Sequence, residues 1–593
     1  MSGGGDAKRN KRLAIIGVST FLLVAMVVAV TVNVGFNNKK EPGEETSKES
    51  HVSQSVKAVK TLCAPTDYKK ECEDSLIAHA GNITEPKELI KIAFNITIAK
   101  ISEGLKKTHL LQEAEKDERT KQALDTCKQV MQLSIDEFQR SLERFSNFDL
   151  NSLDRVLTSL KVWLSGAITY QETCLDAFEN TTTDAGKKMK EVLQTSMHMS
   201  SNGLSIINQL SKTFEEMKQP AGRRLLKESV DGEEDVLGHG GDFELPEWVD
   251  DRAGVRKLLN KMTGRKLQAH VVVAKDGSGN FTTITEALKH VPKKNLKPFV
   301  IYIKEGVYKE YVEVTKTMTH VVFIGDGGRK TRITGNKNFI DGVGTFKTAS
   351  VAITGDFFVG IGIGFENSAG PEKHQAVALR VQSDRSIFYK CRMDGYQDTL
   401  YAHTMRQFYR DCIISGTIDF VFGDSIAVLQ NCTFVVRKPL ENQQCIVTAQ
   451  GRKEKNQPTG LIIQGGSIVA DPKYYPVRLK NKAYLARPWK DFSRTIFLDT
   501  YIGDMITPEG YMPWQTPAGI TGTDTCYYGE YNNRGPGSDV KQRVKWQGVK
   551  TITSEGAASF VPIRFFHGDD WIRVTRVPYS PGATKTPPSR PTH

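Results

Sequence analysis

The sequence lacks the short motifs that would assign a common chemistry to it. No Gly-Xaa-Ser-Xaa-Gly segment occurs in its 593 residues, so the nucleophile elbow of a serine esterase is absent. Zinc-finger spacings and RNA-binding aromatic motifs are also absent, which argues against a nucleic-acid partner. Acidic residues such as Asp384, Asp394 and Asp411 are scattered rather than grouped, so the sequence implies no calcium site, no other metal and no cofactor.

Cysteine is scarce, with nine residues, yet three of the nine form a regular pattern. Cys391, Cys412 and Cys432 lie 21 and 20 residues apart, and a short aromatic or aliphatic run precedes each of them. A repeat of about 20 residues with no amphipathic helix between its apolar runs predicts successive coils of a parallel β-helix. A two-sheet β sandwich is the competing fold, but it would not place the cysteines in such a repeat.

Two aspartates share this repeat. Asp398 lies seven residues after Cys391, and Asp419 lies seven residues after Cys412. If the register holds, the two aspartates are neighbours in adjacent coils, which are about 4.8 Å apart. Two carboxylates at that distance cannot both ionise cheaply, so one site would hold an acid together with a nucleophile or base. The simpler alternative is that each aspartate marks a turn between strands.

The positive charge of the chain, +12 overall, is concentrated in its C-terminal half. Residues 267–593 hold 42 Lys and Arg against 29 Asp and Glu, whereas residues 1–266 hold 38 against 39. A basic enzyme attracts polyanions over a long range, and a carboxylated polysaccharide is one such partner. A surplus of this size is also explained by solubility alone.

The N-terminus carries a targeting signal. Basic residues at positions 8–12 precede an uncharged apolar run, residues 13–32, which is close to the ~20 residues that span a hydrocarbon core. The run is a signal peptide or a type II signal anchor, and the lack of a clear cleavage site favours the anchor. The remaining chain would enter the secretory pathway. Five glycosylation sequons agree with that compartment, at Asn82, Asn95, Asn180, Asn280 and Asn431.

Two different patterns follow along the chain. From about Thr61 to Met217 the apolar residues have helical spacing; Leu153, Val156, Leu157, Leu160 and Leu164 would share one buried helix face. From position 270 onward, short β-branched runs alternate with Gly, Asp and Asn, and the only expected helix is near residues 284–290. The sequence thus predicts an all-α bundle followed by a β solenoid.

The β-rich half resembles plant pectin methylesterases. Five motifs occur in the order and approximate spacing of that family: Gly306-Val-Tyr-Lys-Glu310, Gln375-Ala-Val-Ala-Leu379, Tyr396-Gln-Asp-Thr-Leu400, Asp419-Phe-Val-Phe-Gly423 and Arg487-Pro-Trp489. The resemblance implies a right-handed parallel β-helix that hydrolyses methyl esters of cell-wall pectin in the extracellular cell wall.

The same resemblance implies a role for each candidate residue. Asp419 would be the nucleophile, Asp398 the proton donor and later the base, and Gln397 the donor to the oxyanion. Arg487 would keep Asp419 ionised through a charge-assisted hydrogen bond. Substrate contacts are expected from Arg487 and from three more residues, Thr345, Gln375 and Trp489, the last by stacking on a sugar ring.

The helical half resembles the pectin methylesterase inhibitor family, through the segments Thr61–Cys72 and Trp163–Cys174. That resemblance implies a four-helix bundle with disulfides Cys63–Cys72 and Cys127–Cys174, which inhibits an esterase, either its own or a separate one. A spacer bundle with no affinity for the cleft is the alternative. In the β-helix, stacking one coil apart suggests a Cys412–Cys432 disulfide, and Cys391, Cys445 and Cys526 would be free.

We therefore expect five segments: a signal anchor or signal peptide (1–36), a polar stalk (37–57), the inhibitor-like bundle (58–218), a processing linker (219–266) and the catalytic β-helix (267–593). The linker displays three pairs of basic residues, within Arg223–Leu226, Arg256–Leu259 and Arg265–Gln268, which a processing protease could cleave. Membrane contact through the anchor would precede that cleavage.

Two positions depart from the usual family pattern. Ala486 stands where Gly normally precedes the Arg487 motif, and its methyl group could crowd the floor of the cleft. Asp424 stands where Asn is usual and would add a negative charge near Asp419.

Two other functions compete with esterase activity. A pectin depolymerase with clustered aspartates would lower the viscosity of pectin, whereas demethylation would not. A silenced β-helix that serves only as a wall-binding or inhibitor module is the second alternative. The presence of five expected catalytic and binding side chains argues against it: Gln375, Gln397, Asp398, Asp419 and Arg487.

Overall fold

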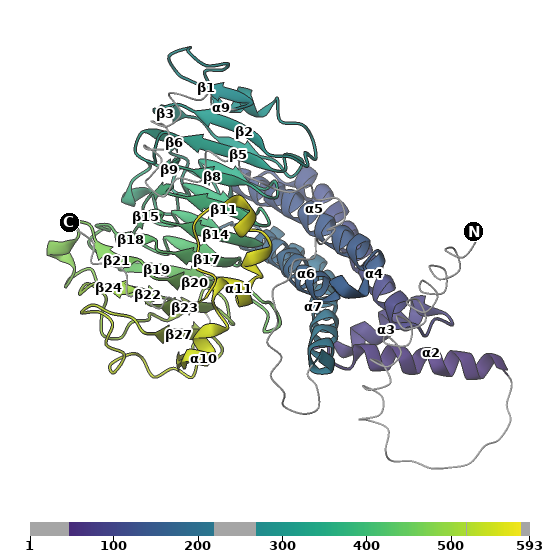
Figure 1. Ribbon diagram of the computed structural model, residues 1–593. Coiled ribbons are helices and arrows are strands. Elements are labelled where there is room, and N and C mark those ends of the chain that lie inside the picture. The colour runs from purple at the N-terminus through teal and green to yellow at the C-terminus, as the bar shows by residue number, and fades with distance from the viewer. Residues whose placement is uncertain (1–46, 219–268, 518, 583–593) are drawn as a thin grey trace, which may run out of the picture. The chain divides into compact units, whose positions relative to one another are not determined.

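The computed structural model describes residues 47–218, 269–517 and 519–582 (Figure 1). The chain divides into two compact units, Met1–Asp231 and Gly232–His593. The predicted anchor and the three basic pairs of the linker lie outside the described residues. Within the described ranges, no helix is both long enough and apolar enough to cross a membrane.

The first unit is a helical bundle. A hairpin of two helices, α2 and α3, precedes four long helices, α4 to α7, which pack in a ring of neighbouring pairs. The bounds are α2 Ser47–Cys63, α3 Lys69–Ala80, α4 Pro86–Ala114, α5 Glu118–Ser146, η1 Leu150–Ser152, α6 Leu153–Asp176 and α7 Ala185–Lys218. The predicted four-helix bundle is confirmed.

Sequence signals explain where these helices begin and which side they bury. Pro86 starts α4, where its missing N–H costs nothing, and Asp117 caps α5 by accepting a 2.7 Å hydrogen bond from the Thr120 amide. The predicted face of α6, from Leu153 to Leu164, is buried. Two disulfides close the unit, Cys63–Cys72 and Cys127–Cys174, and both were predicted.

The second unit is a parallel β-helix of three sheets, as predicted, and not a β sandwich (Figure 1). The eleven-stranded sheet holds β1 Val271–Val273, β2 Phe299–Ile303, β5 Val321–Gly325, β8 Val359–Ile361, β11 Ser386–Tyr389, β14 Arg406–Arg410, β17 Ile426–Gln430, β20 Gly460–Gln464, β23 Arg494–Leu498, β27 Tyr527–Tyr531 and β28 Val549–Thr551. The seven-stranded sheet holds β4 Val312–Val314, β7 Val351–Ile353, β10 Leu379–Val381, β13 Leu400–Ala402, β16 Val421–Gly423, β19 Cys445–Gln450 and β22 Ala483–Ala486.

The third sheet has eight strands and completes each coil. It holds β3 Gly306–Lys309, β6 Thr331–Gly335, β9 Gly364–Asn367, β12 Arg392–Asp394, β15 Ile413–Gly416, β18 Thr433–Val436, β21 Ser467–Ala470 and β24 Tyr501–Ile502. Three short helices accompany the solenoid: α9 Ile284–Leu288, which confirms the expected helix, and α10 Ser554–Ala558 and α11 Pro562–Phe565, which follow its last strand in the chain. A hairpin, β25 Trp514–Thr516 and β26 Gly519–Thr521, lies outside the three sheets.

The corners of a coil differ in length. From β8 to β23, two residues separate each strand of the eleven-stranded sheet from the next strand of the eight-stranded sheet. The first of the two adopts a left-handed conformation each time; Lys390, Asp411 and Asn431 have φ of 52°, 53° and 54°. The corners on either side of the seven-stranded sheet vary in length.

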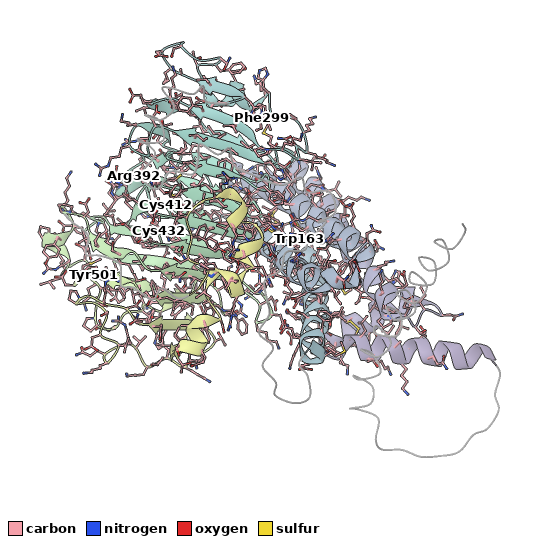
Figure 2. The ribbon with its side chains drawn as sticks, viewed as in Figure 1. Trp163, Phe299, Arg392, Cys412, Cys432 and Tyr501 are labelled. Atoms are coloured by element: carbon pink, nitrogen blue, oxygen red, sulfur yellow. A yellow bond between two sulfur atoms is a disulfide. The ribbon has the colours of Figure 1, made fainter. Side chains whose placement is uncertain are left out.

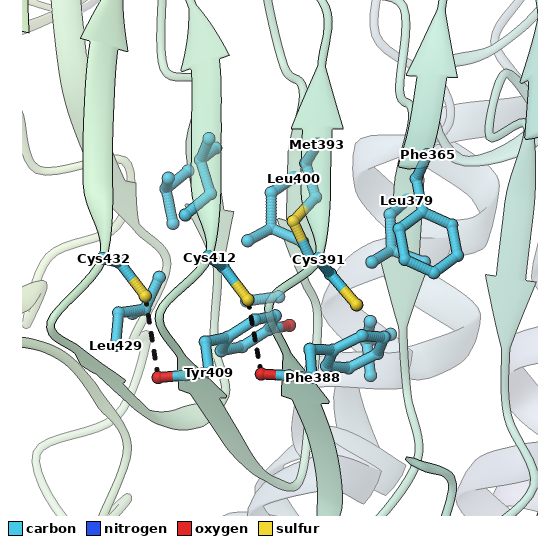
Figure 3. Packing of buried hydrophobic residues seen from close by; sticks show 14 of the residues in the cluster. Phe365, Leu379, Phe388, Cys391, Met393, Leu400, Tyr409, Cys412, Leu429 and Cys432 are labelled. Carbon is cyan, nitrogen blue, oxygen red and sulfur yellow. Dashed lines mark hydrogen bonds between the residues drawn. The ribbon is translucent and has the colours of Figure 1, made fainter. Parts of the chain in front are cut away.

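This constant corner produces the cysteine repeat, because Cys391, Cys412 and Cys432 are the second residues of three successive corners. Strand register aligns them, since Arg392 pairs with Ile413 and Ile413 pairs with Thr433. All three side chains are buried in the core of the β-helix. Figure 2 labels Cys412 and Cys432 among the stacked coils, and Figure 3 shows the packing around the three cysteines.

The predicted Cys412–Cys432 disulfide is wrong, because both residues are free thiols, as are Cys391, Cys445 and Cys526. The Cys412 thiol donates to the carbonyl oxygen of Phe388 (3.3 Å), and the Cys432 thiol donates to that of Tyr409 (3.6 Å) (Figure 3). Stacked side chains run parallel, whereas a disulfide requires the two Cβ–Sγ bonds to converge. Burial raises the pKa of the Cys412 thiol, which keeps it protonated and unreactive.

We expect five thiols in the unfolded, unreduced protein, and none that reacts quickly in the native protein, because the five free cysteines are buried. Labelling with a thiol reagent, with and without denaturant, measures both numbers. A count of three thiols in the unfolded protein would instead show that Cys412 and Cys432 form a disulfide.

Candidate active site

The candidate residues gather around the seven-stranded sheet. Thr345, Gln375, Asp398 and Asp419 each lie just before a strand of that sheet, namely β7, β10, β13 and β16, which are successive neighbours. Arg487 directly follows β22, at one end of the same sheet. Parallel pairing therefore brings residues from five coils to one face of the solenoid.

The two aspartates occupy equivalent turns of adjacent coils. Leu400 pairs with Val421 in the sheet, an offset of 21 residues that also relates Asp398 to Asp419, and the Asp398 amide donates to the carbonyl oxygen of Ile418 (3.0 Å). Both aspartates are buried and both adopt the left-handed conformation, with φ of 64° and 50°. Aspartate tolerates this conformation better than most residues. The predicted stacking is thus present.

Arg487 binds the carboxylate of Asp419 directly. Its Nε donates to Oδ1 (2.8 Å) and to Oδ2 (3.1 Å), and its Nη2 also donates to Oδ2. Burial by itself would lower the pKa of the Arg487 guanidinium, but the charge and hydrogen bonds of Asp419 raise it above its ordinary value. The guanidinium therefore stays charged, and its contact with the Asp419 carboxylate is a fork-shaped, charge-assisted one.

Two glutamines flank the aspartates. Gln397 immediately precedes Asp398, and its carbonyl oxygen accepts from the Ala376 amide (3.2 Å), which ties the turn before β13 to the turn before β10. The side-chain Oε1 of Gln375 is buried and has no hydrogen-bond partner among the described residues. Such an atom is left for a ligand to satisfy.

Aromatic rings cover the outer face of this sheet next to the aspartates. Tyr401 and Phe422 stack with ring centroids 4.2 Å apart, and Trp489 meets both rings edge-on at 6.3 and 5.9 Å. A Cβ atom on Gly451 would lie 2.7 Å from the Trp489 ring, so only glycine fits beneath it. Trp489 is therefore held as a flat, half-buried platform.

Three aromatic residues of this surface were missed in the sequence. Tyr401 sits between Leu400 and Ala402, which both face the core, and Phe422 directly follows the core residue Val421, so strand alternation could have placed both rings outside. Trp514 packs its ring 4.2 Å from the guanidinium carbon of Arg487. It comes from the β25 hairpin, 27 positions further along the chain, and no spacing rule predicts that contact.

The two unusual positions are both buried. Ala486 belongs to the hydrophobic core, so its methyl group packs inward among core residues. Asp424 is buried, and its carboxylate accepts from Gln450 Nε2 (3.0 Å), Gln457 Nε2 (2.6 Å) and the Thr459 hydroxyl. Its predicted electrostatic effect on Asp419 stays a prediction.

Among the described residues, no group of three or more His, Cys, Asp or Glu side chains could hold a metal ion. What the face offers is a carboxylate fixed by arginine, a second carboxylate one coil away, amide groups and an aromatic platform. This combination can attack an electrophilic carbon, move a proton and bind a sugar ring.

Removal of Arg487 should destabilise the protein, because Asp419 would remain buried without its counter-charge. We expect Arg487→Gln to lower the free energy of unfolding by about 2–3 kcal/mol, measured by urea denaturation. Lys453→Gln is the control, because it removes the exposed Lys453–Asp491 pair (2.8 Å), which is expected to contribute about 0.5 kcal/mol. Equal losses in the two variants would contradict the structural role of Arg487.

Comparison with known proteins shows which families the two units match. Residues 270–569 match the family described as pectinesterase, and residues 57–206 match the family described as plant invertase/pectin methylesterase inhibitor. The chain is 49% identical to probable pectinesterase/pectinesterase inhibitor 21 of Arabidopsis thaliana, over 97% of this chain and 83% of the relative. It is 47% identical to probable pectinesterase/pectinesterase inhibitor 58 of the same plant, over 97% and 99%.

Among solved structures, the carrot pectin methylesterase is similar to the second unit. The two chains share 45% sequence identity with a TM-score of 0.52, and the match covers 53% of this chain and 98% of the carrot chain.

Proposed function

Because the chain belongs to the plant pectinesterase family, with an inhibitor-type domain before the pectinesterase domain, we propose that its β-helix hydrolyses methyl esters of homogalacturonan. The products are methanol and galacturonate carboxylates. The observation that carries the proposal is the Asp419 carboxylate, fixed by Arg487 and stacked one coil from Asp398. A serine nucleophile and a metal are not needed for this chemistry.

In the first step, Asp419 attacks the carbonyl carbon of the methyl ester. The carbonyl oxygen becomes negatively charged, and the side-chain amide of Gln397 donates a hydrogen bond to it. When the tetrahedral intermediate collapses, the C–OCH3 bond breaks and Asp398 gives its proton to the departing methoxide. Methanol leaves, and the galacturonate carbonyl remains joined to Asp419 as an anhydride.

In the second step, water replaces methanol. Asp398, now ionised, takes a proton from water, and the hydroxide attacks the carbonyl carbon of the anhydride. The bond to Asp419 breaks, which restores the Asp419 carboxylate and the protonated Asp398, and releases the sugar carboxylate. Arg487 supports both steps, because its charge favours Asp419 as a carboxylate, both as the nucleophile and as the leaving group.

Substrate binding uses the aromatic face. Trp489 offers an apolar ring for sugar stacking, and Gln375, with its unsatisfied Oε1, offers an acceptor for a sugar hydroxyl. Thr345 and Arg487 complete the proposed contacts. Thr345 lies at the start of η3 (Thr345–Lys347), before β7, so it would reach a sugar unit further along the polymer.

We expect Asp419→Asn in the full-length chain, secreted from a eukaryotic host, to release methanol from highly methylated pectin at least about a thousandfold more slowly, because it removes the nucleophile. Asp411→Asn is the matched control. Asp411 is also an aspartate in a left-handed turn of the same coil, but on the far corner. Methanol release and circular dichroism are measured for both variants.

Three results would count against the proposal. Unchanged turnover in Asp419→Asn would exclude the assigned nucleophile. A fall in viscosity without methanol would indicate a depolymerase. A folded wild-type protein that releases no methanol would favour a silent wall-binding module.

We further propose that the helical bundle inhibits the enzyme until the linker is cut. Support comes from the match to the inhibitor family and from the paired basic residues at Arg223–Leu226 and Arg256–Leu259. The mature enzyme would then begin near residue 267, in the cell wall. The two disulfides of the bundle and the exposure of all five sequon asparagines are consistent with passage through the secretory pathway.

Substitution of all three basic pairs (Arg223, Arg224, Arg256, Lys257, Arg265 and Lys266 to Ala) should leave the secreted protein uncut and reduce its methanol release at least about tenfold, because the inhibitor domain stays attached. Mass spectrometry of the secreted protein identifies its N-terminus. An uncut protein with full activity would show that the bundle is a spacer.

A further inference from the structure

Arg437 reaches back along the solenoid to the turn that carries Gln397 and Asp398. It directly follows β18, and its own amide donates to the carbonyl oxygen of Gly416 at the end of β15 (2.8 Å). Its side chain continues one coil further, where Nη1 donates to the carbonyl oxygen of Gly395 (2.7 Å). Arg437 thus spans from its own coil, past the coil of Asp419, to the coil of Asp398.

The same guanidinium also contacts the side chain of Tyr396. Nη2 donates to the Tyr396 hydroxyl (2.8 Å), and the guanidinium carbon lies 3.8 Å from the centre of the ring. Only a planar, forked cation can make all three contacts at once; lysine offers one point charge and no flat face.

The held segment has little room to adjust. The Tyr396 carbonyl oxygen accepts from the Thr417 amide (2.9 Å) and from the Thr399 hydroxyl (3.2 Å). At Gly395, an added Cβ would lie 2.6 Å from the Thr399 hydroxyl oxygen. The turn is therefore pinned on one side by Thr417 and Thr399 and on the other by Arg437.

We propose that Arg437 is a positioning residue for catalysis, which holds Tyr396 and thereby sets the direction of Gln397 and Asp398. This inference rests on the proposed function, in which Gln397 binds the oxyanion and Asp398 transfers the proton. A displacement of about 1 Å in such groups can cost a hundredfold in rate. Because the bound substrate contacts other residues, the loss should appear in kcat and not in KM.

The chain offers a closely matched control. Arg478 lies over Tyr475 at the same 3.8 Å, donates to the Tyr475 carbonyl oxygen (3.0 Å) and also contacts Asp504. It follows η5 (Tyr475–Val477), a segment that carries none of the candidate catalytic residues.

We expect Arg437→Gln in the full-length secreted protein to lower kcat for methanol release about 10- to 100-fold, with KM within about threefold of wild type. Arg478→Gln should leave both constants unchanged. Arg437→Lys should recover part of kcat, because one hydrogen bond can re-form. Tyr396→Phe keeps the ring and loses the hydroxyl that accepts from Arg437, and it should lower kcat about two- to fivefold. This variant tests the same contact if Arg437→Gln fails to fold.

A double-mutant cycle tests whether Arg437 acts through the turn. In a Gln397→Ala background, Arg437→Gln should cost less than it does in wild type, because the group that it positions is gone. Equal effects of Arg437→Gln and Arg478→Gln, or a loss that is fully multiplicative with Gln397→Ala, would overturn the inference. If the folded wild-type protein releases no methanol, the proposed function is wrong, and this inference, which rests on it, is wrong too.

Discussion

The register between neighbouring coils is the constraint on which the site depends. Hydrogen bonds of parallel strands fix which residue of one coil lies beside which residue of the next, and a slip of one position would turn each side chain to the opposite face of the sheet. Asp398 and Asp419 are neighbours only because Leu400 pairs with Val421 and Tyr401 with Phe422. The geometry of the candidate site is therefore a property of the core packing as much as of the acidic residues.

Arginines add a second kind of connection, across coils that are not adjacent in a sheet. Arg487 reaches from the coil of β22 past that of β19 to Asp419. Arg437 reaches from the coil of β18 past that of β15 to Gly395. The two long side chains approach the pair of turns from different strands. The counter-charge of Asp419 and the position of the turn at Gly395 are therefore set independently. One arginine fixes a carboxylate, and the other fixes a stretch of backbone.

Local patterns in the sequence were enough to predict the two folds and the stacked aspartates. Helical spacing in α6 and the cysteine repeat in β-rich coils both reflect neighbours that are close in sequence or one coil apart. Prediction failed for Cys412 and Cys432, because adjacency in register says nothing about the direction of the Cβ–Sγ bonds. Trp514 and Arg437 were missed because their contacts cross several coils or come from an irregular hairpin.

The unequal corners of the coil have a consequence for how this scaffold can change. From β8 to β23, one corner admits only two residues, the first of them left-handed, so an insertion there would break the stacking. The two corners that flank the seven-stranded sheet already differ in length from coil to coil. Insertions and deletions should therefore be tolerated best beside the seven-stranded sheet, at the face of the proposed site, where they would alter which polymers fit and leave the solenoid intact. Natural diversity and laboratory redesign should both concentrate there.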